Sequence, residues 1–426
     1  MTRKIVSKLL VTLIIIGFVL GFIKQNIPSL YSVLTYLDEA FILILFIYNI
    51  KEIVIKHRVI LLLTILYILV GFIGGLIQGA PLNILAFGSF ISTKSFMLYM
   101  AISVIPFKSK DIDRVFKVLD WMFPFIYISL ILDLVIGPSF RETLNLGAGD
   151  IRMGIRAIGG LFSHLSVMAF AGMLYYLIYS FIRVNKMKKI LSLAMIFLPI
   201  KIKEIFAFIL TYFMSKFKKI SVKVIVSSLV VFMGIFTAYQ YYLPDHYNTY
   251  FNTDNTDNVA RLAMIATSIE IAKDRFPLGE GCGRFGGTIS SQYYSPVYHK
   301  YGIDNIWGLQ EDSEFNFIQD TFWPMILGES GILGLMVYIG ILIAIFKNVI
   351  TDYFEKKTMY NQFVVYMLTF FLIASAANPV FVNSPHNLVL FGIFGMMNGY
   401  YIRCSHSLHN NIKKQKENFD NNNIIK

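Results

Sequence analysis

The chain has 426 residues, of which 56% are hydrophobic and only 15% charged, and its net charge is +12. A soluble domain carries about one quarter charged residues, so this composition excludes an ordinary soluble protein. Apolar runs of about 18 residues or more recur without strand-like alternation, which predicts an all-α polytopic transmembrane bundle. The positive charge does not indicate nucleic-acid binding, because Lys and Arg gather in short loops between the apolar runs.

The basic loops alternate with loops poorer in Lys and Arg, and the positive-inside rule assigns the basic set and both termini to the cytoplasm. The N-terminal apolar segment resembles a signal peptide but shows no small-residue cleavage site before Lys24, so we expect an uncleaved first span. Two crossings fit between neighbouring basic loops, which predicts about twelve spans. The expected spans are 9–23, 33–50, 59–78, 84–106, 118–137, 157–182, 190–200, 204–215, 224–243, 331–346, 358–377 and 387–402.

These spans divide the chain into four parts. We expect an N-terminal bundle over 1–243, a large extracytoplasmic loop with short amphipathic helices over 244–330, C-terminal spans over 331–403, and a disordered cytoplasmic tail over 404–426. Segments 190–200 and 204–215 are each too short to cross about 30 Å. We therefore expect Lys201 and Lys203, at the break between them, to lie in a polar cavity on the outer side. The alternative is one long helix with snorkelling lysines.

The large outer loop begins with a predicted helix from about Val259, capped by Asp254, Asp257 or Asn258. Apolar residues at helical spacing (Val259, Leu262, Ala266 and Ile269) predict its buried face. Pro277 ends the helix, and a glycine-rich stretch, Gly281-Cys-Gly-Arg-Phe-Gly286, follows. This stretch fits the G-x-G-x-x-G spacing of a dinucleotide-binding site, but no predicted strand precedes it. We expect instead a turn whose backbone approaches a ligand, with Arg284 pointing at it.

Seven cations lie on the outer side, where the positive-inside rule does not favour them. We expect at least three to converge on a phosphate, since arginine forks match phosphate oxygens, although solvated charge is the simpler reading for several of them. These cations are Arg152, Arg156, Lys201, Lys203, Arg261, Arg275 and Arg284.

A general base requires a positioned carboxylate or histidine. Asp320 leads a short apolar helix at the membrane edge, and Glu314 lies nearby, whereas Glu311 and Asp312 fit a hydrated acidic loop. His164 lies near the outer end of a span and is either packed or catalytic. The remaining histidines show no metal-ligand spacing, so we predict neither a metal nor a cofactor. Cys282 and Cys404 fall on opposite sides of the membrane and cannot pair. Tyrosines crowd the outer loop as an interfacial belt or as platforms for sugar rings.

Three pieces of the chain, in order, resemble the superfamily of O-antigen ligases and of O-antigen and capsular polysaccharide polymerases. The stretch Arg156-Ala-Ile-Gly-Gly-Leu-Phe enters a span as that family's Arg-x-x-Gly-x-Phe stretch does. Arg261 leads a helix into Pro277-Leu-Gly-Glu-Gly281-Cys-Gly-Arg-Phe285, which is similar to the family's glycine-rich loop. Asp320 through Glu329-Ser-Gly-Ile-Leu-Gly334 is similar to its closing helix.

The resemblance implies metal-independent glycosyl transfer at the outer face of the plasma membrane, with a polyprenyl-pyrophosphate-linked oligosaccharide as donor. It also implies partners, namely membrane lipid and possible chain-length regulator and flippase proteins. The implied pyrophosphate-binding residues are Arg156, Lys201, Lys203, Arg261 and Arg284, and the candidates for catalysis are Asp320, Glu314 and His164.

Family ligases tend to place His where this chain has Asp320, which favours a polymerase of repeat units. The alternatives are a ligase that moves the glycan to a final acceptor and, ranked lower, a transporter of the lipid-linked oligosaccharide. A transporter would concentrate its charge near the membrane midplane rather than in one outer loop.

Overall fold

We describe residues 2–147, 150–152, 154–216, 260–312, 316–355, 358–376 and 378–400 of the computed structural model. Helices dominate these residues, and the sheet they contain is a two-stranded antiparallel pair of β1 (Ile151–Arg152) and β2 (Ile155–Arg156). Within the same residues seven helices are long and apolar enough to cross a membrane. The predicted class, a helical membrane protein, is therefore confirmed.

The described helices include long apolar ones and short connecting ones. The N-terminal half contains α1 (Arg3–Asn26), α2 (Pro28–Leu34), α3 (Leu37–Tyr48), α4 (Ile50–Lys56), α5 (Arg58–Ile77), α6 (Leu82–Ser103), α7 (Ser109–Ile136), α8 (Pro138–Thr143) and α9 (Leu165–Leu177). It continues with the π-helix η1 (Ile178–Ile182), α10 (Lys186–Phe197) and α11 (Ile202–Lys216). The C-terminal half contains α14 (Ala260–Asp274), α15 (Thr288–Gln292), α16 (Pro296–Lys300), α17 (Trp323–Glu355), α18 (Met359–Ala374) and η3 (Leu388–Ile393).

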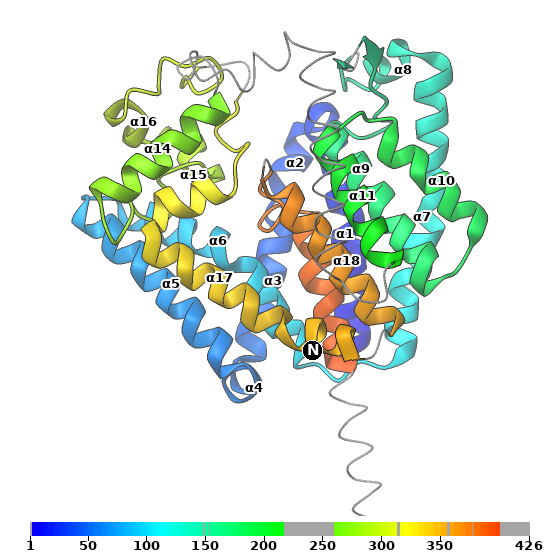
Figure 1. The fold of residues 1–426 in the computed structure, drawn as a ribbon, viewed down its shortest axis with the longest axis horizontal. Coiled ribbons are helices and arrows are strands. Elements are labelled where there is room, and N and C mark those ends of the chain that lie inside the picture. Colours follow the sequence, from blue (N-terminus) through cyan, green and yellow to red (C-terminus); the bar gives the residue numbers. More distant parts are fainter. Residues whose placement is uncertain are drawn as a thin grey trace, which may run out of the picture.

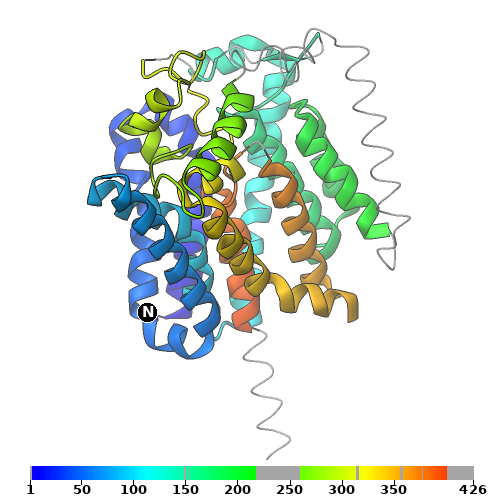
Figure 2. The ribbon, with the colours of Figure 1, turned by 60° about the vertical axis from the view of Figure 1, so that its left-hand side comes forward.

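α8, the β-pair and α14 to α16 lie at one end of the bundle, whereas α4 lies at the other end (Figure 1). In Figure 1, α14, α15 and α16 lie at the upper left, and α8 with the β-pair lies at the upper right, whereas the N-terminus lies at the lower end. α5 packs on α6 and α17, α9 packs on α10, and α11 packs on α18. Figure 2 shows the segment from α14 to α17 covering the upper end of the helices α5 and α6.

Buried charges inside the bundle are paired, as lipid-facing segments require. The Lys94 ammonium on α6 lies 3.0 Å from Glu39 and 3.6 Å from Asp38, both on α3. Asp133, near the end of α7, is fully buried and lies 2.7 Å from Arg156.

The break predicted around Lys201 is present. α10 ends at Phe197 and α11 begins at Ile202, and between them Ile200 adopts a φ of 50°. A β-branched residue in this left-handed region marks a sharp reversal that a continuous helix does not allow. The alternative of one long helix is therefore wrong.

Two other expectations about helices need correction. Residues 157–164 precede α9 as irregular chain rather than as part of the span, because their backbone bonds to neighbours, as when the Ile158 N–H donates to the Leu198 carbonyl at 3.0 Å. The predicted face of α14 is also wrong, since Ile269 is 45% exposed while Ala263 and Met264 are buried. α14 carries small or apolar residues on both sides, so periodicity did not identify the face that packs on α17.

Span 224–243, the capping residues before α14 and the tail from 404 lie outside the described residues.

Candidate functional site

Five polar side chains from separate segments form what we call the cationic cluster: His164, Lys201, Lys203, Arg261 and Asp320. His164 is the N-cap of α9, and Lys201 and Lys203 lie at the start of α11. Arg261 lies in the first turn of α14, and Asp320 lies three residues before α17. Lys203 is within electrostatic range of Lys201, Arg261 and Asp320, and His164 is within range of both lysines.

The closest contact in the cluster joins Arg261 to Asp320, whose Nη2 and Oδ2 atoms are 3.0 Å apart. Both side chains are about one third exposed, at 36% and 35%. The Arg261 Nε is buried and has no hydrogen-bond partner among the described residues. A buried donor without a partner costs free energy, so this guanidinium retains a donor for a ligand oxygen.

The ammonium groups of Lys201 and Lys203 are partly desolvated. Burial lowers the pKa of Lys203 to about 8, with Glu204 opposing the shift and the charges of Arg261 and Lys201 adding to it. The Lys203 Nζ lies 3.7 Å from the carboxylate of Glu204, which is almost fully buried. Burial also lowers the pKa of Lys201, and the nearby charge of Arg152 adds to this effect. An anion that entered the cluster would offset the cost of confining these positive charges.

The side chain of His164 caps the N-terminus of α9. Its Nδ1 accepts a hydrogen bond of 3.3 Å from the Ser166 N–H, so in the neutral ring the proton sits on Nε2. Desolvation by the surrounding protein lowers the pKa of His164, and the charges of Lys201 and Lys203 lower it further. A neutral His164 is a hydrogen-bond donor through Nε2 rather than a base.

Arg156 does not join the cluster. Its Nη1 lies 2.7 Å from the Asp133 carboxylate, and its Nη2 donates to the Asp133 carbonyl. The other carboxylate oxygen of Asp133 accepts from the N–H groups of Gly159 and Gly160, at 2.8 Å each. These contacts fasten the 156–160 segment to the end of α7. Arg156 therefore has a structural role in this geometry, in place of the expected position beside Arg261.

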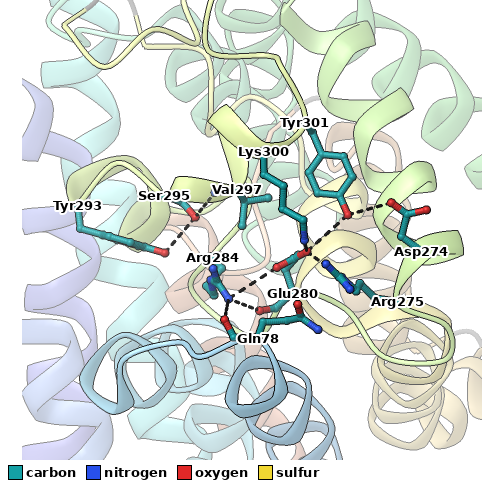
Figure 3. Close-up of polar contacts among 10 residues, drawn as sticks. All are labelled: Gln78, Asp274, Arg275, Glu280, Arg284, Tyr293, Ser295, Val297, Lys300 and Tyr301. Atoms are coloured by element: carbon teal, nitrogen blue, oxygen red, sulfur yellow. Dashed lines mark hydrogen bonds and ion pairs between the residues drawn. The ribbon is translucent and has the colours of Figure 1, made fainter.

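Arg284 also lies elsewhere, in what we call the Glu280 anchor. Figure 3 shows Arg275, Arg284 and Lys300 directed at the Glu280 carboxylate, which is 1% exposed. The Arg275 Nε lies 3.1 Å from it and the Arg284 Nη1 lies 3.6 Å from it. The Arg284 Nη1 also donates to the Gln78 carbonyl at 3.2 Å.

The anchor is separated from the cationic cluster by the length of α14. Arg261 lies at one end of this helix and Arg275 directly follows the other end. Fourteen residues of α-helix span about 21 Å. Burial opposes ionisation of Glu280, but the hydrogen bond from Lys300, that from Arg275 and the charge of Arg284 together hold its pKa below the ordinary value of 4.5. The anchor is thus an internal ion network.

The glycine-rich turn packs against helices rather than leaving its backbone open. A Cβ on Gly283 would lie 2.7 Å from the Ile84 carbonyl, and a Cβ on Gly88 would lie 2.2 Å from the Gly283 nitrogen. The Gly283 N–H donates to the buried Glu329 carboxylate at 2.8 Å. The backbone of this turn therefore contacts α6 and α17 closely, and the predicted approach to a ligand stays a prediction.

The described tyrosines of the outer segment are buried or half-buried. Tyr294 and Tyr298 are buried in a small core with Met264 and Phe285, while Trp307 is 59% exposed. Glu314 lies outside the described residues. Among the described residues, no group of three or more His, Cys, Asp or Glu side chains is arranged to hold a metal ion.

Sequence reasoning overlooked three neighbours of the cluster. Asp150 pairs with Arg152 at 2.7 Å and is within range of Lys201. Glu204 follows Lys203 directly, a signal that was visible in the sequence. His386 is buried, packs on Phe170 with ring centroids 4.2 Å apart, and is within range of His164 and Lys203. Nothing in the local sequence around His386 indicated that proximity.

No protein-family model and no curated protein sequence matches this chain.

Proposed function

We propose that the protein is a membrane glycosyltransferase that polymerises polyprenyl-pyrophosphate-linked oligosaccharide repeat units into a surface polysaccharide. The observation that carries the proposal is the gathering of Lys201, Lys203 and Arg261 with Asp320, from three segments distant in sequence. Three cations suit a pyrophosphate, and one carboxylate suits a base. The resemblance of the chain to the polysaccharide polymerase and ligase superfamily supports the same reading.

The proposed reaction replaces one bond from the anomeric carbon to oxygen with another and transfers one proton. The hydroxyl oxygen of one repeat unit attacks the anomeric carbon of another, and the bond from that carbon to the pyrophosphate breaks with its electron pair going to the pyrophosphate. The hydroxyl proton moves to Asp320, whose Oδ1 takes no part in the contact with Arg261. Lys201, Lys203 and Arg261 would stabilise the charge that develops on the leaving pyrophosphate.

His164 takes a different role from the one expected for a base. Since its Nδ1 accepts from the Ser166 N–H, a neutral ring would offer the Nε2 hydrogen to a substrate oxygen. We therefore assign proton abstraction to Asp320 and substrate orientation to His164. Arg156 and Arg284 have no direct contact with substrate in this proposal, because Asp133 and Glu280 occupy them.

We further propose that the cluster faces the outer side of the plasma membrane, with both termini in the cytoplasm and about twelve crossings in all. The distribution of Lys and Arg supports this topology. α8, the β-pair and α14 to α16 lie at the end of the bundle opposite the N-terminus (Figure 1), as an outer substrate-binding face would require.

Mass spectrometry of lipid-linked glycans from cells that lack the protein tests the proposal. We expect single repeat units on the polyprenyl carrier and no long chains. Long chains that accumulate on the carrier would indicate the ligase instead. Single units trapped on the cytoplasmic face, inaccessible to an externally added glycosidase, would indicate the transporter.

A further inference from the structure

A cavity of about 620 Å³ lies on the side of the bundle between α7 and the start of α10. Its α7 wall includes Lys117, Asp120, Trp121 and Ile128, and its other wall includes Arg183 and Lys188. Neither the proposed reaction nor the cationic cluster uses any of these residues.

The cavity lies near the membrane surface opposite the cationic cluster. His164 and Arg183 flank the helical segment Leu165–Ile182, which has 18 residues. A helix of that length spans about 27 Å, close to the hydrocarbon thickness of a bilayer. Arg183 and Lys188 belong to a basic loop, which the positive-inside rule assigns to the cytoplasm. The cavity therefore opens at the cytoplasmic leaflet.

The charged end of the cavity carries an excess of positive charge. Three cations (Lys117, Arg183 and Lys188) line it together with one carboxylate, Asp120. The Lys188 Nζ lies 2.7 Å and the Arg183 Nη1 3.5 Å from that carboxylate. Both cations remain about one third exposed, at 35% and 30%. The Arg183 Nη2 also lies 3.7 Å from the exposed carboxylate of Asp113, and the exposed surface of both cations leaves room for a further anion.

The remaining wall of the cavity is apolar and faces lipid. Trp121 is 67% exposed and Ile128 is 52% exposed, and the two lie on the same face of α7, about two turns apart. Pro124 lies between them inside the helix, where proline removes a backbone hydrogen bond and loosens local packing. A tryptophan at this level is typical of the membrane interface. The wall thus leads from the cations toward the bilayer interior.

We propose that this cavity binds an anionic phospholipid of the cytoplasmic leaflet. The lipid phosphate bonds to Arg183 and Lys188, and an acyl chain lies along Trp121 and Ile128. Charge complementarity carries the choice of occupant, because a zwitterionic headgroup would bring a further cation against three existing ones. Basic pockets between membrane helices on the cytoplasmic side are suited to such headgroups.

Native mass spectrometry of the full-length protein with equimolar dioleoyl phosphatidylglycerol and dioleoyl phosphatidylcholine tests the proposal. We expect selective retention of phosphatidylglycerol. Arg183→Gln with Lys188→Gln should weaken it about 25-fold, at roughly fivefold per cation near a membrane surface. The matched control, Lys56→Gln with Arg58→Gln on another basic loop, should leave it unchanged.

Asp120→Asn separates lipid binding from a purely structural ion pair. Removal of the Asp120 carboxylate takes one competing anion away from both cations and leaves Asp113 beside Arg183, so retention of phosphatidylglycerol should increase. Quenching of tryptophan fluorescence by dibrominated phosphatidylglycerol should also fall in Trp121→Phe. Equal retention of both lipids by the wild type, or weaker binding by Asp120→Asn in folded protein, would overturn the proposal. Preferential displacement of phosphatidylglycerol by polyprenyl phosphate would assign the cavity to the carrier lipid instead.

Discussion

The guanidinium of Arg261 lies 3.0 Å from the carboxylate of Asp320, which follows it in the sequence by 59 positions. The contact joins the first turn of α14 to the chain that enters α17. It leaves one carboxylate oxygen of Asp320 and the Nε of Arg261 for other partners. A base and a cation thus share one position, which suits a reaction that removes a proton beside a departing anion.

Replacement of Arg261 tests whether its guanidinium stabilises the leaving pyrophosphate. We expect Arg261→Ala to lower kcat/KM for the lipid-linked donor by about 100-fold or more, as loss of a preorganised donor to a developing charge does. Arg261→Lys should keep part of the activity. Lys273→Ala, at the exposed far end of the same helix, is the matched control. Unchanged chain lengths of the product in cells expressing Arg261→Ala at normal levels would contradict the proposed role.

Replacement of Asp320 tests whether its carboxylate accepts the hydroxyl proton. Asp320→Asn keeps the shape and still offers an oxygen to Arg261, but it cannot accept the proton. We expect kcat to fall about 100-fold or more, with donor binding largely kept. Single-turnover kinetics in nanodiscs would separate the two quantities. A variant that loses binding and keeps kcat would place Asp320 in substrate recognition instead.

The charge of Lys203 predicts a pH dependence. Because burial lowers its pKa to about 8, the ammonium is charged below that pH and neutral above it. We expect KM for the donor to rise about tenfold between pH 7 and pH 9, the scale of one lost charge-assisted hydrogen bond. Lys203→Arg should abolish the rise, because a guanidinium stays charged throughout. Identical pH profiles for the two proteins would exclude Lys203 as a ligand of the pyrophosphate.

The Glu280 anchor predicts a second pH effect, on stability. The folded-state pKa of Glu280 lies below its ordinary value of 4.5. Its stabilisation is therefore complete above that value and is lost as the pH falls through the folded-state pKa. Glu280→Gln should cost about 3 kcal/mol at neutral pH, since it leaves the anchor's cations without a carboxylate. Its Tm should also respond less to acid. Lys300→Gln, at the more exposed rim, should have a much smaller effect.

Close packing at Gly88 can be tested with a matched glycine. A Cβ at Gly88 would lie 2.2 Å from the Gly283 backbone, whereas a Cβ at Gly340 would meet only Leu63 at 3.9 Å. Gly88→Ala should therefore lose about 1–3 kcal/mol through overpacking. Gly340→Ala should match or exceed the wild type in thermal unfolding, because alanine favours the helix. Equal Tm values would contradict the close approach.

Hydropathy and charge alone predicted the helical membrane class and the break at Lys201. Both follow from local composition, since the two short apolar segments could not each cross a bilayer. The assembly of the cluster was predicted in part: Lys201, Lys203 and Arg261 come together, but Arg156 and Arg284 do not. Each of those arginines meets a buried carboxylate. Asp133 lies on α7 and Arg156 lies in β2, and only folding reveals that contact.

For Arg284 the signal was present and was not used. Glu280 precedes it by four positions in the same glycine-rich turn, and a carboxylate that close competes with any ligand. The face of α14 could not be inferred at all, because small and apolar residues lie on both sides. Packing on α17 decided which side was buried, and that contact is set by residues more than fifty positions away.

α14 connects the Glu280 anchor to the cationic cluster. The C-terminal end of α14 is held by the ion pair of Arg275 with Glu280, and its N-terminal end carries Arg261. Over about 21 Å, a tilt of only 5° moves Arg261 by about 2 Å, enough to separate it from Asp320. Substitutions around Glu280 would thus change the contact between Arg261 and Asp320, and with it the proposed reaction, through the angle of a single helix.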